Sequence, residues 1–256
     1  MSRYLSKFIL FVGLYVHMRS LVLKLAVALA SVTLTQIVSF GGDGCGCGVV
    51  RLLDGRTLDD FESIPKLPKD EIARAYSISN GIMRAAGEIG ALLITRDTYS
   101  DFDLSFDVCY PEDGFGDGGI SLFVRTLPDR TDVYTGLEIQ TKTGDLGDIW
   151  GLPRFVISRD AETPPPKGRM NVQIGEVFRR MPRFKDVPHI PGRWMHVDFT
   201  RKGLDCELKI DGILVNRCRL QESCEGRIGF QTKPYPQGKA PVLYRNMFLT
   251  PVKSAK

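Results

Sequence analysis

The sequence predicts an all-β protein, an antiparallel β-sandwich or jelly roll that follows an N-terminal signal segment. Short stretches that alternate between apolar and polar residues recur from residue 49 to residue 250. Turn residues separate these stretches, and none of them carries a sustained helical period with capping residues. The 26 glycines and 15 prolines among 256 residues are typical of a turn-rich β protein.

The predicted strands follow one another along the chain. Residues 77–84 turn at Asn80-Gly81, a dipeptide that favours a tight hairpin, and residues 91–95 form a short apolar strand. Between 101 and 110 every second residue is apolar, as in a strand with one buried face. Further strands are predicted at 118–126, 134–141, 153–158, 194–200, 204–210, 213–219, 226–232 and 242–250. The span 164–193, rich in proline and arginine, predicts a long surface loop, either a lid over the sheet or a solvated insertion.

The first 40 residues have the features of a targeting segment. Two apolar runs, at 8–16 and 21–40, are accompanied by basic residues and by no acidic one. The second run follows Met18 and Arg19, as in a secretory signal peptide with its own start codon. We therefore expect export to the periplasm, the cell surface or the medium, with a glycine-rich leader at 41–50 and a domain at 51–252. The alternative is a retained membrane anchor, for which 16 residues from Leu25 to Phe40 are short.

The net charge of +4 also comes from this segment, because residues 41–256 hold 30 basic and 30 acidic residues. A balanced charge offers no electrostatic basis for binding nucleic acid, so we exclude that class of partner. Membrane contact is expected only through an uncleaved N-terminal segment. The sequence leaves the oligomeric state open.

Six cysteines leave the disulfide pairing undetermined. A predicted hairpin with its turn at 211–212 brings Cys206 and Cys218 close together. A two-residue turn, however, places Cys206 opposite Arg217, so a disulfide there needs a bulge or a different loop. Cys218 and Cys224 are the competing pair. Buried free thiols are the third alternative, because a chain of this length does not depend on a disulfide to fold.

Two strand-like runs and a loop between residues 118 and 151 present the candidate site. One face of these runs is apolar and is expected to pack on the core. Polar and aromatic side chains share the other face and the glycine-punctuated loop that follows: Arg125, Glu138, Gln140, Asp145, Asp148 and Trp150. Such a face suits sugar binding or acid/base chemistry.

A series of motifs runs in order along the chain: RLLDGRTL at 51–58, GALLITRDTYSDFDL at 90–104, GGISLFVR at 118–125, GLEIQ at 136–140, GDIWG at 147–151, GRIGFQ at 226–231 and YRNMF at 244–248. In this order they resemble the signatures of the 3-keto-disaccharide hydrolase domain family. The resemblance spans about residues 51 to 250 and implies a secreted domain with a concanavalin-A-like (laminin-G-like) jelly roll. It also implies a carbohydrate substrate, a 3-keto glycoside or disaccharide whose glycosidic bond is cleaved.

Such cleavage needs a base for the acidic C2 proton beside the ketone and a cation or donor for the enolate oxygen. We assign the base to Glu138 and the electrostatic partner to Arg125. Gln140 and Gln231 are expected to bind sugar hydroxyls, with Trp150 as an aromatic platform.

Three further side chains are candidates for chemistry. Asp145 and Asp148 are second choices for acid/base work, or could hold a divalent cation through their oxygens; beyond that cation no cofactor is predicted. His196 is a candidate proton carrier.

Each residue also has a structural interpretation. Glu138 and Arg125 could form a solvated cross-strand ion pair, and the two aspartates could shape a turn. Trp150 could be a core or rim aromatic, and His196 a surface histidine. The chain also departs from the family pattern at Lys142, at Asp148 and at Lys233, which stands where the family often has a histidine. A non-catalytic carbohydrate-binding module is therefore the alternative function, and an adhesive cell-surface domain is a third.

Overall fold

The computed structural model describes residues 48–86, 89–111, 115–159, 163–164, 172–174, 177–233 and 241–252. All of them belong to one unit, Gly46–Lys256. The expected signal segment at 1–40 and most of the leader lie outside the described residues, so export remains a prediction. In the described part of the chain, no helix is long and apolar enough to cross a membrane.

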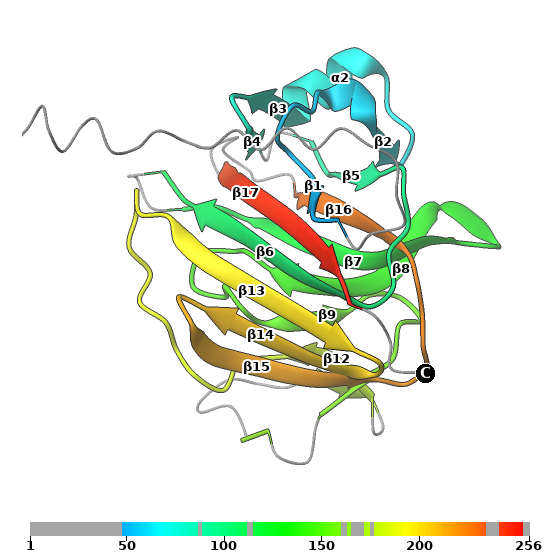
Figure 1. Ribbon diagram of the computed structural model, residues 1–256. Coiled ribbons are helices and arrows are strands. Elements are labelled where there is room, and N and C mark those ends of the chain that lie inside the picture. The colour runs from blue at the N-terminus through cyan, green and yellow to red at the C-terminus, as the bar shows by residue number, and fades with distance from the viewer. Residues whose placement is uncertain are drawn as a thin grey trace, which may run out of the picture. The chain divides into compact units, whose positions relative to one another are not determined.

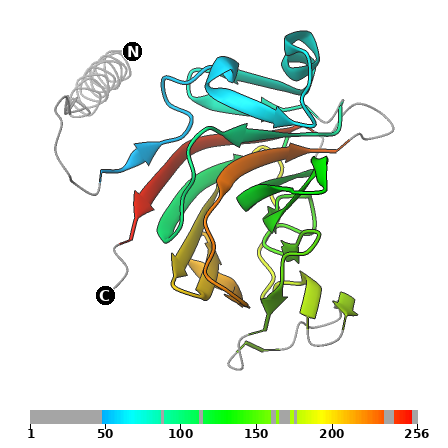
Figure 2. The same cartoon turned by 90° about the vertical axis from the view of Figure 1, so that its right-hand side faces the viewer.

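Two antiparallel sheets packed face to face form the predicted sandwich (Figures 1 and 2). Sheet A has the strand order β10-β15-β14-β13-β6-β17-β4-β3, with β1 paired to β17. Its strands are β1 (Val50–Arg51), β3 (Tyr76–Ser79), β4 (Ile82–Ala85), β6 (Phe102–Cys109), β10 (Ile157–Ser158), β13 (Met195–Lys202), β14 (Asp205–Ile210), β15 (Ile213–Leu220) and β17 (Val242–Pro251).

Sheet B has the order β11-β12-β9-β8-β7-β16-β5-β2. Its strands are β2 (Phe61–Ile64), β5 (Ala91–Thr95), β7 (Gly118–Leu127), β8 (Arg130–Gln140), β9 (Ile149–Gly151), β11 (Val172–Ile174), β12 (Val177–Met181) and β16 (Arg227–Thr232). In Figure 1 sheet A lies in front of sheet B, and α2 (Lys69–Ala75) lies at one end of the sandwich near β2 and β3.

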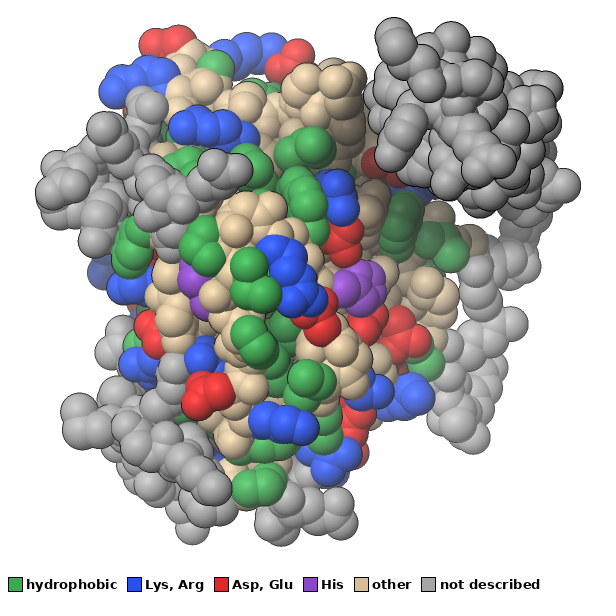
Figure 3. Space-filling view, turned by 90° about the vertical axis from the view of Figure 1, so that its left-hand side faces the viewer, with side chains coloured by type: hydrophobic (Ala, Val, Ile, Leu, Met, Phe, Trp, Pro, Cys, Tyr) green, Lys and Arg blue, Asp and Glu red, His purple; other side chains and the backbone are tan. Residues whose placement is uncertain are grey.

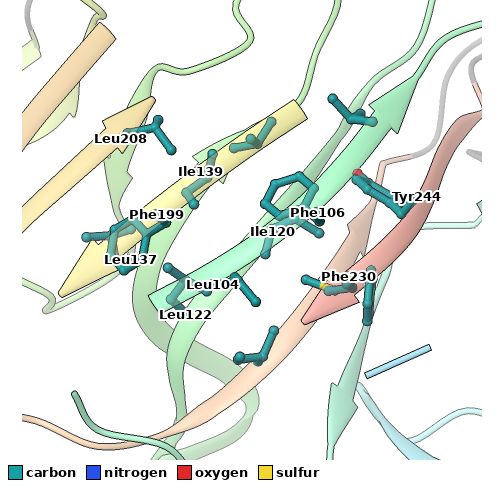
Figure 4. Packing of buried hydrophobic residues seen from close by; sticks show 14 of the residues in the cluster. Leu104, Phe106, Ile120, Leu122, Leu137, Ile139, Phe199, Leu208, Phe230 and Tyr244 are labelled. Carbon is teal, nitrogen blue, oxygen red and sulfur yellow. The ribbon is translucent and has the colours of Figure 1, made fainter. Parts of the chain in front are cut away.

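The core lies between the sheets and follows from the period-two pattern of the strands. Leu104 and Phe106 of β6 point toward sheet B, and Ile120 of β7 and Ile139 of β8 point back at them (Figure 4). All four side chains are buried. Each such residue contributes on the order of 2 kcal/mol of transfer free energy to folding, which makes the register of the sheets specific.

Several local elements differ from the expectation. No stretch of the sequence has a sustained helical period, but η1 (Leu58–Asp60) and α2 are present; each is too short to show such a period. The strand expected at 153–158 begins only at Ile157, because Arg154 adopts a left-handed backbone (φ 64°) in a turn. β11 and β12 lie within the span 164–193, where a loop was expected, and β12 extends sheet B by pairing with β9.

A bulge in β7 breaks the expected alternation after Leu122. The register with β8 shifts between Leu122 and Arg125, and Phe123 has a left-handed backbone with φ 56°. Its side chain turns into the core, where it is fully buried, and Val124 takes the opposite face. Gly226 makes the bulge fit, because a Cβ at that position would lie 2.2 Å from the Phe123 carbonyl carbon. The bulge therefore moves Arg125 out of phase with Ser121.

Candidate functional site

Polar side chains gather in three rows on the outer face of sheet B, the face turned away from the core. In the first row Ser121, Glu138 and Trp150 are cross-strand neighbours on β7, β8 and β9. In the second row Gln231 and Gln140 flank Gly119. Strand alternation continues this face to a third row made by Lys233, Asp117 and Lys142. We call these side chains the sheet-B site.

Glycine creates the hollow in which the central carboxylate lies. A Cβ on Gly119 would stand 2.8 Å from Cδ of Glu138, so the carboxyl group occupies the space that a side chain would fill. On the neighbouring strand, a Cβ on Gly229 would in the same way stand 2.8 Å from a methyl carbon of Leu92. The two glycines thus let side chains from adjacent strands fold down onto the sheet.

The environment of Glu138 makes it a base suited to neutral pH. Its side chain is 2% exposed, and this burial raises its pKa to about 7. The charge of Lys233 and the side chain of Gln231 act to lower this pKa, and the charge of Asp117 acts to raise it further. The Lys233 ammonium lies 4.0 Å from Oε1. The Gln140 amide, oriented to satisfy its neighbours, donates to the same oxygen at 2.9 Å. A carboxyl group with a pKa near the working pH can both take up and release a proton.

Five polar atoms in these rows are buried and have no hydrogen-bond partner among the described residues: Asp117 Oδ1, Ser121 Oγ, Glu138 Oε2, Trp150 Nε1 and Gln231 Oε1. Buried polar atoms in folded proteins nearly always have a partner, so a cluster of five on and beside adjoining strands needs an explanation. Together they offer hydrogen-bond donors and acceptors of the kind that sugar hydroxyl groups engage.

The sheet-B site has apolar side chains on one side and charged side chains on the other. On one side Gln231 Nε2 donates to the Tyr134 hydroxyl at 2.9 Å, and Tyr134 packs on an apolar group, Ile64, Leu92, Ile94 and Val124. Burial raises the pKa of Tyr134 to about 12, which keeps its hydroxyl protonated at neutral pH. On the other side Lys142 lies 3.5 Å from Asp117. An apolar wall facing charged groups is a usual composition for a small-molecule site.

Arg125 does not join Glu138. The β7 bulge directs its exposed side chain to a small hollow that it shares with Phe155 and Cys224. The cross-strand pair expected between Arg125 and Glu138 is therefore not formed, and Lys233 is the cation beside the carboxylate.

Asp148 forms a buried structural ion pair with Arg180. It is fully buried and accepts hydrogen bonds from Arg180 Nη2 at 2.6 Å and from the Arg183 backbone N–H at 3.0 Å. Asp145 lies 3.2 Å from the same Arg180 nitrogen. Their oxygens face guanidinium groups, and the described residues contain no group of three or more ligands that could hold a metal ion. Arg180 also lies 5.2 Å above the Trp150 ring, which fixes the indole beside Glu138.

His196 lies on the outer face of sheet A, so the whole sandwich separates it from Glu138. Its Nδ1 is 2.8 Å from Asp107 and its Nε2 is 3.1 Å from Asp198. Burial alone would lower the pKa of His196, but the bond to Asp107 and the two negative charges outweigh it and raise the pKa. Figure 3 shows a histidine side chain at the surface beside acidic side chains.

A hollow of about 350 Å³ also lies on the outer face of sheet A, lined among others by Asp103, Asp198, Glu207 and Lys209. None of its described polar side-chain atoms is both buried and without a partner. These charged groups are cross-strand neighbours on a solvated face. We therefore place the candidate site at sheet B.

The structure brings together Glu138, Gln140, Gln231 and Trp150, as the sequence analysis expected, and their roles remain predictions. Ser121, Asp117 and Tyr134 were not predicted from the sequence as site residues, and Lys142 and Lys233 were recognised only as departures from the family pattern. The sequence does show which positions share a face within each strand, because side chains alternate. Residues 117, 119 and 121 share one face, residues 138, 140 and 142 share one, and residues 231 and 233 share one. What was not visible is that these strands lie side by side.

Comparisons with known proteins agree with this architecture. Residues 48–250 match the model of a family described as the 3-keto-alpha-glucoside-1,2-lyase-like domain. A solved protein from Parabacteroides distasonis, described as a "putative glycosyl hydrolase", is similar at a TM-score of 0.55 and 14% identity, covering 80% of this chain and 94% of that one. A second protein of that organism with the same description gives a TM-score of 0.50 and 17% identity over 78% and 98%. At these identities the likeness concerns the fold alone. No curated protein matches the chain.

Proposed function

This chain belongs to the 3-keto-alpha-glucoside-1,2-lyase-like domain family, and from that premise we propose that it cleaves the glycosidic bond of 3-keto glycosides or disaccharides at the sheet-B site. One observation carries the proposal. A buried carboxyl group, Glu138, has a pKa raised to about 7 and lies among buried polar atoms that have no partner among the described residues. A purely structural surface rarely combines these features.

The reaction follows from the acidity of a proton beside a ketone. Ionised Glu138 takes the proton from C2, and the electrons of the C–H bond pass into the enolate of the C3 ketone. When the enolate collapses, a C1=C2 double bond forms and the bond from C1 to the glycosidic oxygen breaks. The leaving sugar departs with a proton from protonated Glu138 or from water. Water then adds across the double bond, so the net reaction is hydrolysis.

Lys233 is the best candidate to stabilise the enolate oxygen. Its ammonium group lies 4.0 Å from Glu138 and is 45% exposed, so it can approach a bound ligand without leaving the carboxylate. It thereby supplies the positive charge that the sequence analysis assigned to Arg125. It also stands at the position where the resemblance places a histidine. A cation aimed at developing negative charge contributes most where water is excluded.

The remaining groups would bind and orient the sugar. Gln231 Oε1 and Ser121 Oγ can accept or share hydrogen bonds with hydroxyl groups, and Trp150 Nε1 can donate one. Gln140 holds Glu138 through its amide. Fixing the ring with its C2 proton against Glu138 supplies the orientation that proton transfer needs.

The test compares turnover of a 3-keto-glucoside and a 3-keto-disaccharide by the full chain, by Glu138→Gln and by Glu207→Gln. Glu207 is a carboxylate on the outer face of sheet A, in an ion pair with Arg217, and it is the matched control. We expect Glu138→Gln to lower kcat by about 10²- to 10⁴-fold, the usual contribution of a positioned base. The control should keep its rate. Equal turnover by the wild type and Glu138→Gln would remove Glu138 as the base.

A second function, binding a carbohydrate without cleaving it, is favoured by one observation. The Glu138 side chain is 2% exposed, so a substrate must reach a carboxylate that the free protein nearly encloses. Glycan binding that survives in Glu138→Gln, together with no turnover by the wild type on any 3-keto sugar, would support this alternative.

A further inference from the structure

Two free thiols face each other across the hairpin formed by β14 and β15. Cys206 and Cys218 are register partners in this antiparallel pair. Each side chain is 1% exposed and belongs to the core between the sheets. We propose that Cys206 and Cys218 close a cross-strand disulfide when the chain folds under oxidising conditions.

A bulge produces this pairing. The two-residue turn at Asp211-Gly212 sets Ile210 opposite Ile213, and that register alone would oppose Cys206 to Arg217. Between Leu208 and Lys209 the register shifts by one residue on the β15 side. Every pair beyond the shift is therefore displaced, and the two cysteines meet.

The geometry suits a disulfide. Directly opposed residues in an antiparallel pair have Cα atoms about 4.5–5.5 Å apart. A disulfide needs about 4.4–6.8 Å, so closure requires little movement of the backbone. The neighbouring Cys218 thiol, followed by burial, raises the pKa of Cys206.

Cys224 is the competing partner, because its thiol also interacts with Cys206. It lies beyond the end of β15, and Arg201 holds it in place. The guanidinium donates to the Cys224 carbonyl and lies 3.9 Å from its sulfur. Among the four cysteines in the described part of the chain, only Cys206 and Cys218 are held opposite each other by a strand ladder.

The chemistry is thiol–disulfide exchange, with a small oxidised disulfide such as oxidised glutathione as the oxidant. One cysteine loses its proton, attacks a sulfur of the oxidant and releases one reduced thiol. The second cysteine, also deprotonated, attacks the mixed disulfide and releases the other thiol. The two protein sulfurs are oxidised, one new S–S bond forms, and one oxidant disulfide becomes two thiols. Because both cysteines are buried and Cys206 is held protonated, we expect closure during folding and slow exchange afterwards.

The experiment refolds the full chain with a mixture of reduced and oxidised glutathione, blocks the remaining thiols and maps linked peptides by mass spectrometry. We expect a peptide pair joined through Cys206 and Cys218, and a Tm about 5–10 °C above that of the reduced protein. The proposal is overturned if no linkage forms, or if the main linkage joins Cys224 or a cysteine of residues 1–47 to either partner.

Two variants separate the hairpin bridge from other thiol effects. Cys206→Ala should lose both the linkage and the dependence of Tm on oxidation. Cys109→Ala, which removes a buried free thiol on β6, should keep both. Because the mapping uses the wild-type chain, its result stands even if a variant fails to fold. A Tm that still responds to oxidation in Cys206→Ala would contradict the assignment.

Discussion

Glu138 is a carboxyl group that the fold removes from water without giving both of its oxygens a partner. Oε1 is held by Gln140 and approached by Lys233, while Oε2 has no partner among the described residues. Burial of this kind disfavours the ionised form, so the group has a cost to stability at high pH. The same burial raises the pKa of Glu138 toward neutrality, and perturbed pKa values of this kind are concentrated at sites of proton transfer.

The pH dependence of stability tests this description of Glu138. Its pKa is 4.5 in the unfolded chain and about 7 in the folded one. Between these values the folded state binds the proton more tightly, so the free energy of unfolding falls as pH rises, by about 3 kcal/mol in total for a shift of this size. Glu138→Gln lacks this titration and should gain stability over the wild type by that amount between pH 4.5 and pH 8.5. Urea unfolding of both proteins measures it, and a difference that does not change with pH would contradict the buried carboxyl.

The Asp148 carboxylate has the opposite character, because guanidinium groups compensate its burial. Asp148→Asn removes the charge that faces Arg180 and Arg183, and we expect a loss of about 3 kcal/mol in unfolding free energy. Asp186→Asn is the matched control, since Asp186 pairs with the same Arg183 from a side chain that is 81% exposed. The control should change stability by less than about 1 kcal/mol. If Asp148→Asn keeps its stability but loses turnover, the acid/base role considered for Asp148 would be restored.

At the scale of elements, glycines and bulges decide where side chains lie. The β7 bulge takes Arg125 off the outer face of sheet B, and the β15 bulge brings Cys218 opposite Cys206. Each bulge inserts one residue into its strand. The residue that follows therefore has another face or another cross-strand partner than simple alternation predicts. Strand existence could be predicted from alternation and turn residues, as the hairpin at Asn80-Gly81 confirms: both residues have a positive φ, 51° and 71°.

Gly119 offers a test of the hollow that holds Glu138. In Gly119→Ala the new Cβ would lie 2.8 Å from Cδ of Glu138, the mobile end of a side chain, so the carboxyl group should move while the strand stays in place. We expect turnover to fall at least about tenfold, with a stability loss below about 1 kcal/mol. Gly229→Ala is the matched control, because its Cβ would press on Leu92 instead. Its rate should change less than that of Gly119→Ala, and the reverse order would show that the hollow does not position Glu138.

At the scale of the whole molecule, the sandwich places two polar surfaces on opposite outer faces. His196, Asp107 and Asp198 lie on sheet A, and Glu138 lies on sheet B. The core between them keeps the two surfaces chemically separate, so Glu138 and His196, the base and the proton carrier suggested by the sequence, cannot act on one substrate. This separation is why we assign the proposed reaction to sheet B alone.

Export is a prediction at the same scale. The apolar run at 21–40 predicts cleavage near its end, so a bacterial host that secretes the protein should release a chain that begins close to residue 41. N-terminal sequencing of the secreted protein measures this. Recovery of the full-length chain in the membrane fraction would support the retained anchor instead.

Side-chain alternation and turn residues act over a few positions, so they were enough to predict the sandwich and the place of Glu138 on a polar face. They could not predict which cation accompanies Glu138, which carboxylates are neutralised by arginine, or which thiols lie opposite each other. These outcomes depend on bulges that shift register and on strand order that joins β7, β8 and β16. Glu138 and Lys233 lie far apart along the chain, so no local sequence pattern predicts that Lys233 Nζ lies 4.0 Å from Glu138 Oε1.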